Sequence, residues 1–229
     1  MSIIYFIRHG QASFGTDNYD RLSETGQEQS RILARHLGER KTAFDLTVSG
    51  SLERQQHTAD CFFEGSSRPE HLVLPELNEY DSRAIMTTLT PSVLEEKPEL
   101  QQDAQKLLKD RKSFQRVFEA VMLRWVSGNH SNNLVSFADF SAGINRSIDR
   151  LMTDHGSGKT IGVFTSGGPV STAVQRALGI AHEEVMRINW QVANTSVTRF
   201  RCTESRFSLL SFNEYGHLEA AGDEYITFR

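Results

Sequence analysis

Cysteine is scarce in this chain and long apolar runs are absent. The first feature argues against a disulfide-rich protein, and the second argues against a membrane-spanning one. Cys61 and Cys202 are its only two cysteines, and their neighbours in the sequence indicate a helix and a strand. We therefore expect two free thiols in a reducing cytoplasm, with a disulfide between them as the alternative. No apolar run approaches the roughly 18 residues of a membrane span, and the first residues lack the pattern of a secretion signal. The sequence thus favours a cytoplasmic protein without membrane contact.

An excess of charge of one sign is also missing. Lys and Arg number 25 and Asp and Glu number 29, which gives a net charge of −4. Nucleic-acid-binding domains carry a basic excess, so we expect no nucleic-acid partner. No group of Cys and His has the spacing of metal ligands, so we expect no metal. The 229 residues contain no repeat, low-complexity tract or linker, which predicts a single domain over residues 1–229 and leaves the oligomeric state open.

Strand-like and helix-like segments alternate through the first third of the chain. The expected strands are Ile3–Ile7, Phe44–Ser49 and Leu72–Leu74, separated by a helix with a capping box at Thr25 and Glu28 and by a helix from Ser51 to about Phe63. Such alternation predicts an α/β fold, a mostly parallel, doubly wound sheet with helices on both faces.

Residues 80 to 131 break this alternation. Pro91 and Pro98 interrupt polar, helix-favouring sequence that includes Leu94–Asp110, and apolar residues then recur at helical spacing from Phe114 to Met122. We expect an α-helical cap inserted into the domain. Beyond it, the sequence predicts a helix from Phe137 that ends near Gly156, a strand at 160–164, a helix at 170–179, and an antiparallel pair at 196–202 and 207–212.

Polar, glycine-bearing segments follow three of the expected strands. They are Arg8-His9-Gly10, Ser49-Gly50-Ser51 (which leads into a helix with Arg54) and Thr165-Ser166-Gly167-Gly168, and Glu79 follows a further strand. Ligands of open α/β sheets bind at the carboxyl ends of the strands. Two arginines, a histidine, a carboxylate and backbone N–H groups at one rim would suit a phosphate group, with a nucleophile and an acid beside it. Each residue alone is better explained as part of a surface ion pair or as a structural histidine, but their joint placement favours the pocket.

Seven segments carry a resemblance to a known family, in the family's order and over nearly the whole chain. They are Arg8-His9-Gly10-Gln11-Ala12, Leu22-Ser23-Glu24-Thr25-Gly26, the segment from Ser49 to Ala59, Leu77-Asn78-Glu79, Phe137-Ala138-Asp139-Phe140, Asn194 to Thr198, and Phe212 to Leu218. The sequence resembles the histidine phosphatase superfamily, which has the phosphoglycerate mutase-like fold.

The resemblance implies a phosphoric monoester hydrolase that needs no cofactor. His9 would be the nucleophile and form a phosphohistidine, and Glu79 would protonate the leaving oxygen and then activate water. Arg8 and Arg54 would hold the phosphoryl oxygens, so no metal is needed to supply positive charge. The expected phosphate-binding residues are Arg8, Gly10, Gln11, Arg54, Ser166 and Gly167. The substrate would be a phosphorylated small molecule or protein.

Two positions depart from the family's pattern. Ser166 stands where a second histidine is expected, and Gln55 stands in place of an alanine. A serine hydroxyl is neutral and shorter than an imidazolium, so a catalytically weak phosphate-ester binding or scaffold protein is the alternative to a phosphatase. On this basis Ser166→His should leave the activity unchanged or raise it. A phosphoglycerate mutase is less favoured, because Gln11, Ala12, Phe14 and Gly15 depart from the mutase version of the first motif.

Overall fold

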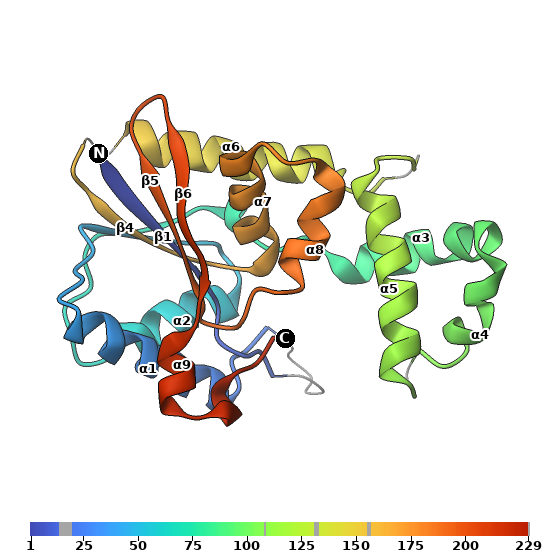
Figure 1. Cartoon of the computed structure of the whole chain (residues 1–229), viewed down its shortest axis with the longest axis horizontal. Coiled ribbons are helices and arrows are strands. Elements are labelled where there is room, and N and C mark those ends of the chain that lie inside the picture. Colours follow the sequence, from blue (N-terminus) through green and yellow to red (C-terminus); the bar gives the residue numbers. More distant parts are fainter. Residues whose placement is uncertain (14–19, 108, 131–132, 155–156, 229) are drawn as a thin grey trace.

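Six strands form one mixed sheet in the computed structural model, which describes residues 1–13, 20–107, 109–130, 133–154 and 157–228 (Figure 1). They are β1 (Ser2–Arg8), β2 (Leu46–Ser49), β3 (His71–Val73), β4 (Thr160–Thr165), β5 (Val197–Cys202) and β6 (Phe207–Glu214), in the order β3-β2-β4-β1-β5-β6. The pairs among β1 to β4 are parallel, and β5 and β6 are antiparallel. The predicted mostly parallel sheet and its final antiparallel pair are therefore confirmed. The carboxyl ends of β1, β2 and β4 meet at one edge.

Helices cover both faces of this sheet, as the alternation predicted. They are α1 (Glu24–Glu39) and α2 (Glu53–Phe62) on one face, and α6 (Phe137–Thr153) and α7 (Gly167–Leu178) on the other. Successive side chains of a strand point to opposite faces, so β1 serves both layers. Phe6 packs with Ile148 of α6, whereas Ile7 packs with Leu33 of α1. The register of β1 is thereby fixed, because a slip by one residue would exchange the side chains on its two faces.

Several predicted boundaries were wrong by a few residues. Helix α1 is capped by Ser23, whose hydroxyl accepts from the Gly26 N–H at 3.0 Å, and not by a capping box of Thr25 and Glu28. Serine is a strong N-cap because its short side chain reaches the free amides of the first turn. Helix α2 begins at Glu53 rather than Ser51, and β2 begins at Leu46 rather than Phe44. The predicted end of α6 near Gly156 falls outside the described residues, and α6 ends at Thr153.

Residues 82 to 126 form a group of helices that projects beyond the sheet (green, Figure 1). They are α3 (Ser82–Glu96), a 3-10 turn at Pro98–Leu100, α4 (Gln101–Ala104) and α5 (Arg111–Val126). Pro91 lies inside α3 instead of interrupting it. Packing compensates for the hydrogen bond lost there, because the buried face continues across the proline from Leu89 to Val93.

The helix-favouring sequence of Leu94–Asp110 does not form one continuous helix. Pro98 disfavours the helical conformation of the residue before it, and Lys97 accordingly leaves the helical region (φ −124°, ψ 72°) and ends α3. The group has an apolar core of its own around Val121, Met122 and Trp125, which continues onto Phe137 at the start of α6. The expected helical character of the segment is therefore confirmed, although its helices are divided differently.

The remaining short elements complete the chain after β3 and around α7 and β6. They are η1 (Pro75–Leu77), η3 (His182–Glu184), α8 (Val185–Asn189), α9 (Gly216–Ala221) and η4 (Asp223–Tyr225). Helix α7 begins at Gly167, three residues before the predicted start, and it ends at Gly179 in the left-handed region at φ 65°. Cys61 and Cys202 are both buried free thiols. Among the residues that the structure describes, no helix combines the length and apolar character needed to cross a bilayer.

Candidate active site

His9 lies directly after β1 and is almost fully buried, with 4% of its surface exposed. Its Nδ1 lies 2.7 Å from the Gly10 carbonyl oxygen, which can only accept, so Nδ1 carries the proton. Its Nε2 accepts from Nε of Arg54 at 3.2 Å. The ring therefore presents a lone pair on Nε2 toward the guanidinium, which is the tautomer that a nucleophilic imidazole needs.

Burial lowers the pKa of His9 well below its ordinary value, and the positive charges of Arg54 and Arg8 lower it further. The hydrogen bond to the Gly10 carbonyl opposes this only in part. Because a protonated imidazole has no free lone pair, a depressed pKa keeps His9 reactive at neutral pH.

Two guanidinium groups flank His9. Arg54 lies in the first turn of α2, just after the end of β2, and its Nη1 donates to Asp20 at 2.6 Å. Arg8 is the last residue of β1, and its Nη1 donates to the backbone carbonyls of Val192 and Phe228. The charges of both arginines also act on Glu79, since they lower its pKa. The structure therefore brings these four predicted residues together at the carboxyl edge of the sheet.

Glu79 faces the start of α7. Both carboxylate oxygens accept from the Gly168 N–H, at 3.1 and 3.2 Å. Burial raises the pKa of Glu79, while the Gly168 N–H and the charges of Arg54 and Arg8 oppose the rise. A carboxyl group with a raised pKa holds its proton more readily near neutral pH, as a general acid must.

Ser166 is the N-cap residue of α7 and has no exposed surface. Its Oγ accepts from Nε2 of Gln55 at 2.8 Å. Gly167 follows it, and a Cβ there would lie 2.2 Å from Oδ1 of Asn189, so a side chain at this position would require Asn189 to move. Ser166 thus lies in the wall of the site rather than at its open surface.

The backbone N–H groups of Gly10 and Gln11, two of the predicted phosphate-binding residues, both donate within the protein. The Gly10 N–H donates to the Thr58 hydroxyl at 3.0 Å, and the Gln11 N–H donates to Oε1 of Gln29 at 2.8 Å. A Cβ on Gly10 would lie 2.3 Å from the Gly26 carbonyl oxygen. The lack of a side chain at Gly10 therefore allows its backbone to lie against that of Gly26. The N–H groups of Gly10 and Gln11 already have acceptors within the protein.

Several residues support the site in a way that could not be predicted from the sequence, because only the fold brings them into contact with it. Asn194 donates to the His9 carbonyl at 3.0 Å, and Gln29 also holds the C-terminal segment through the Tyr225 carbonyl and the Thr227 hydroxyl. Thr58 and Asn194 each lie in a segment that resembles the family, but neither segment indicated which group in the site these side chains contact. The described part of the chain holds no group of three or more His, Cys, Asp or Glu that could bind a metal ion.

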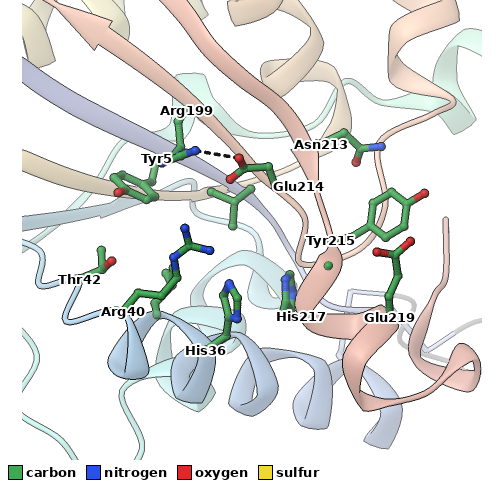
Figure 2. A pocket seen from close by; sticks show the side chains of 13 residues that line it. Tyr5, His36, Arg40, Thr42, Arg199, Asn213, Glu214, Tyr215, His217 and Glu219 are labelled. Atoms are coloured by element: carbon green, nitrogen blue, oxygen red, sulfur yellow. Dashed lines mark hydrogen bonds and ion pairs between the residues drawn. The ribbon is translucent and has the colours of Figure 1, made fainter.

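A separate cavity of about 400 Å³ lies between the end of α1, β6 and α9, and no predicted site residue lines it (Figure 2). His36 and His217 face each other in it, with ring centroids 5.6 Å apart. Burial and the neighbouring His36 lower the pKa of His217 to about 4. Nε2 of His217 lies 3.4 Å from the hydroxyl of Thr195, whose N–H donates to the Arg8 carbonyl.

We predict that buried histidines make the protein less stable as the pH falls from about 6.5 toward 4. The unfolded chain protonates His217 near pH 6.5 and the folded chain only near 4, so protons favour unfolding in this window. The contribution is at most about 3 kcal/mol at pH 4. In urea unfolding at several pH values, His217→Gln should show a shallower decline than the wild type. Part of the decline should remain, since His71 also has a pKa of about 4. Equal slopes would contradict the prediction.

Comparisons with known proteins identify the family and the fold. The family model of the histidine phosphatase superfamily (branch 1) matches residues 4–215. No curated protein matches this chain.

Among solved structures, a putative alpha-ribazole-5'-P phosphatase from Escherichia coli has a TM-score of 0.65 at 23% identity, covering 93% of this chain and 98% of its own. YhfR of Bacillus stearothermophilus has a TM-score of 0.71 at 15% identity, covering 95% and 100%. A phosphoserine phosphatase variant from Entamoeba histolytica has a TM-score of 0.63 at 19% identity, also covering 95% and 100%. Likenesses at such identities show the fold alone. The family match over most of the chain goes further, and the chain belongs to the histidine phosphatase superfamily, branch 1.

Proposed function

We propose that this protein hydrolyses phosphate monoesters through a phosphohistidine on Nε2 of His9. The observation that carries the proposal is a buried, neutral imidazole whose Nε2 lone pair faces Arg54, beside a carboxyl group of raised pKa. This combination supplies a nucleophile, a cation for the phosphoryl oxygens and a proton donor in one place.

In the first step, Nε2 of His9 attacks phosphorus while the bond from phosphorus to the ester oxygen breaks. Glu79 gives its proton to the departing oxygen, and the alcohol leaves. In the second step, the Glu79 carboxylate takes a proton from water as the hydroxide attacks phosphorus. The N–P bond breaks, inorganic phosphate leaves, and His9 and Glu79 return to their starting states. Arg8 and Arg54 neutralise the charge that spreads over the phosphoryl oxygens.

The helices over residues 82 to 126 are our candidate for the element that selects the ester group. They precede α6 and share a hydrophobic core with it, and Tyr80 leads into them directly after Glu79. We propose that residues 1–229 form a single cytoplasmic domain with this segment as its cap. Solved structures of similar fold include phosphatases for alpha-ribazole-5'-P and phosphoserine, which supports a phosphorylated small molecule over a protein as the substrate.

Two alternatives remain as outcomes of the test. A phosphate-ester binding protein without turnover is favoured by one observation, the buried neutral hydroxyl of Ser166 in the wall of the site. A phosphoglycerate mutase is less favoured on the first motif alone, and Phe14 and Gly15 of that motif lie outside the described residues.

Hydrolysis by the pure wild-type protein tests the proposal. We expect it to release phosphate from p-nitrophenyl phosphate and from part of a panel of phosphorylated sugars, amino acids and nucleosides, at the same rate with and without a metal chelator. Quenched reactions should contain a phosphoenzyme that is stable in alkali and labile in acid. Tight binding of esters with no phosphate release would support the binding protein, and phosphate transfer between phosphoglycerates would support the mutase.

A further inference from the structure

We infer that Gln55 is a positioning residue that holds the proton donor Glu79 in place relative to His9 and Arg54. This inference rests on the proposed function and deepens it. Gln55 follows Arg54 on α2 and is fully buried. Its Nε2 donates to the Leu77 carbonyl at 3.1 Å and to Oγ of Ser166 at 2.8 Å. One amide group thus joins three segments of the chain that each carry part of the site.

These contacts close a ring of hydrogen bonds and short chain segments. From Gln55 one contact leads to Leu77, and Glu79 lies two residues further along the chain. Glu79 accepts from the Gly168 N–H, and Ser166 lies two residues before Gly168 and accepts from Gln55. The Leu77 carbonyl also accepts from the Thr165 hydroxyl at 2.6 Å, so Gln55 is one of two side chains that hold it. Loss of Gln55 would leave the Glu79 carboxylate with the Gly168 N–H but would remove one of these two anchors from the segment that carries it.

The surroundings of the Gln55 side chain indicate that its NH₂ group is the part that matters. Its Oε1 is buried and accepts no hydrogen bond. The same oxygen lies directly against Gly50, where a Cβ would be only 2.0 Å away. A buried amide oxygen without a donor disfavours the folded state, so an apolar side chain of equal length would pack better here. Only the two bonds donated by Nε2 account for a polar residue at this position.

A misplaced Glu79 should matter most when the leaving group needs a proton. An alkoxide is a poor leaving group and depends on a general acid, whereas p-nitrophenolate leaves without one. Removal of Gln55 should therefore slow the attack of His9 on alkyl phosphates more than its attack on p-nitrophenyl phosphate. A role in holding the fold alone would slow both reactions alike.

The experiment measures phosphoenzyme formation by rapid quench with an alkyl phosphate and with p-nitrophenyl phosphate. Gln55→Met, which keeps the length and removes the donors, should slow formation from the alkyl ester about tenfold and from p-nitrophenyl phosphate less than about twofold. Gln56→Met is the matched control. It is the next residue on α2, and its Nε2 donates to the Ser51 carbonyl at an exposed position. This variant should match the wild type with both esters.

Two further variants separate the possible outcomes. Glu79→Gln should show a stronger dependence on the leaving group than Gln55→Met. If wild type forms no phosphoenzyme, or Glu79→Gln shows no such dependence, the proposed function fails and the inference with it. Glu79→Gln can behave as expected while Gln55→Met slows phosphoenzyme formation equally from both esters, or slows it from neither ester. In either case only the inference is overturned. Ser166→Ala removes one acceptor of Gln55, and its effect should not add to that of Gln55→Met, because both break the same ring.

Discussion

Replacing His9 by alanine is expected to abolish turnover on every phosphate monoester that the wild-type protein hydrolyses. The imidazole is buried, the charges of both arginines act on it, and its Nε2 lies 3.2 Å from Nε of Arg54. Loss of a covalent nucleophile typically lowers kcat by more than about 10³-fold. Steady-state hydrolysis and quenched phosphoenzyme assays measure the effect, and no phosphoenzyme should form.

The variant should still bind phosphate or vanadate, because Arg8 and Arg54 remain. This separates the loss of the nucleophile from the loss of the pocket. His57→Ala is the matched control, since His57 lies on α2 three residues after Arg54 and is only partly buried. It should keep the wild-type rate. A His9→Ala rate within about tenfold of wild type would place the nucleophile elsewhere.

The sheet was predictable from the sequence because its signals are local. Apolar runs such as Ile3–Ile7 and Thr160–Phe164 are too short and too β-branched for helices, and parallel order follows from the helices between them. Boundaries were less predictable because they depend on single contacts. Ser23 caps α1 through one hydrogen bond to Gly26, and nothing in the spacing of Thr25 and Glu28 excludes the alternative start.

The residues at the strand ends were also predictable, whereas their partners were not. The edge of a parallel sheet collects the residues that follow its strands, so the proximity of His9, Arg54 and Glu79 follows from topology. The contact from Arg8 to Val192 spans 184 positions and depends on the side-chain rotamer. The acceptors of the Gly10 and Gln11 N–H groups likewise depend on how α1 and α2 pack against β1. No pattern in the sequence carries such information.

Gln55 and Ser166 illustrate the same limit. Each departs from the family's pattern at its own position, and the two positions are 111 residues apart. Nothing in the sequence indicates that the two departures are related. The structure shows that their side chains form one hydrogen bond in a fully buried place. The two departures are therefore one feature of the site, and a change at either residue acts on the other.

Ser166→His is accordingly expected to lower activity by at least about tenfold, rather than leave it unchanged or raise it. Ser166 has no exposed surface, and the space beside it is filled by Gln55, whose Oε1 in turn lies against Gly50. An imidazole is larger than a hydroxymethyl group, so it must displace Gln55 and break the ring that holds Glu79. The measurement is kcat/KM with p-nitrophenyl phosphate and with an alkyl ester, together with thermal unfolding.

The double variant Gln55→Ala, Ser166→His should reverse the loss. Truncation of Gln55 opens room for the imidazole, which can then donate to a phosphoryl oxygen, and one added donor to a developing oxyanion is worth up to about 10²-fold in rate. Its kcat/KM should therefore exceed that of Gln55→Ala and that of Ser166→His, a strongly non-additive result. If Ser166→His alone raised the activity, the site would have room that the structure does not show, and the coupling of the two residues would be wrong. If the double variant were the least active of the three, the imidazole would reach no substrate oxygen, and the serine would be the better residue for this pocket.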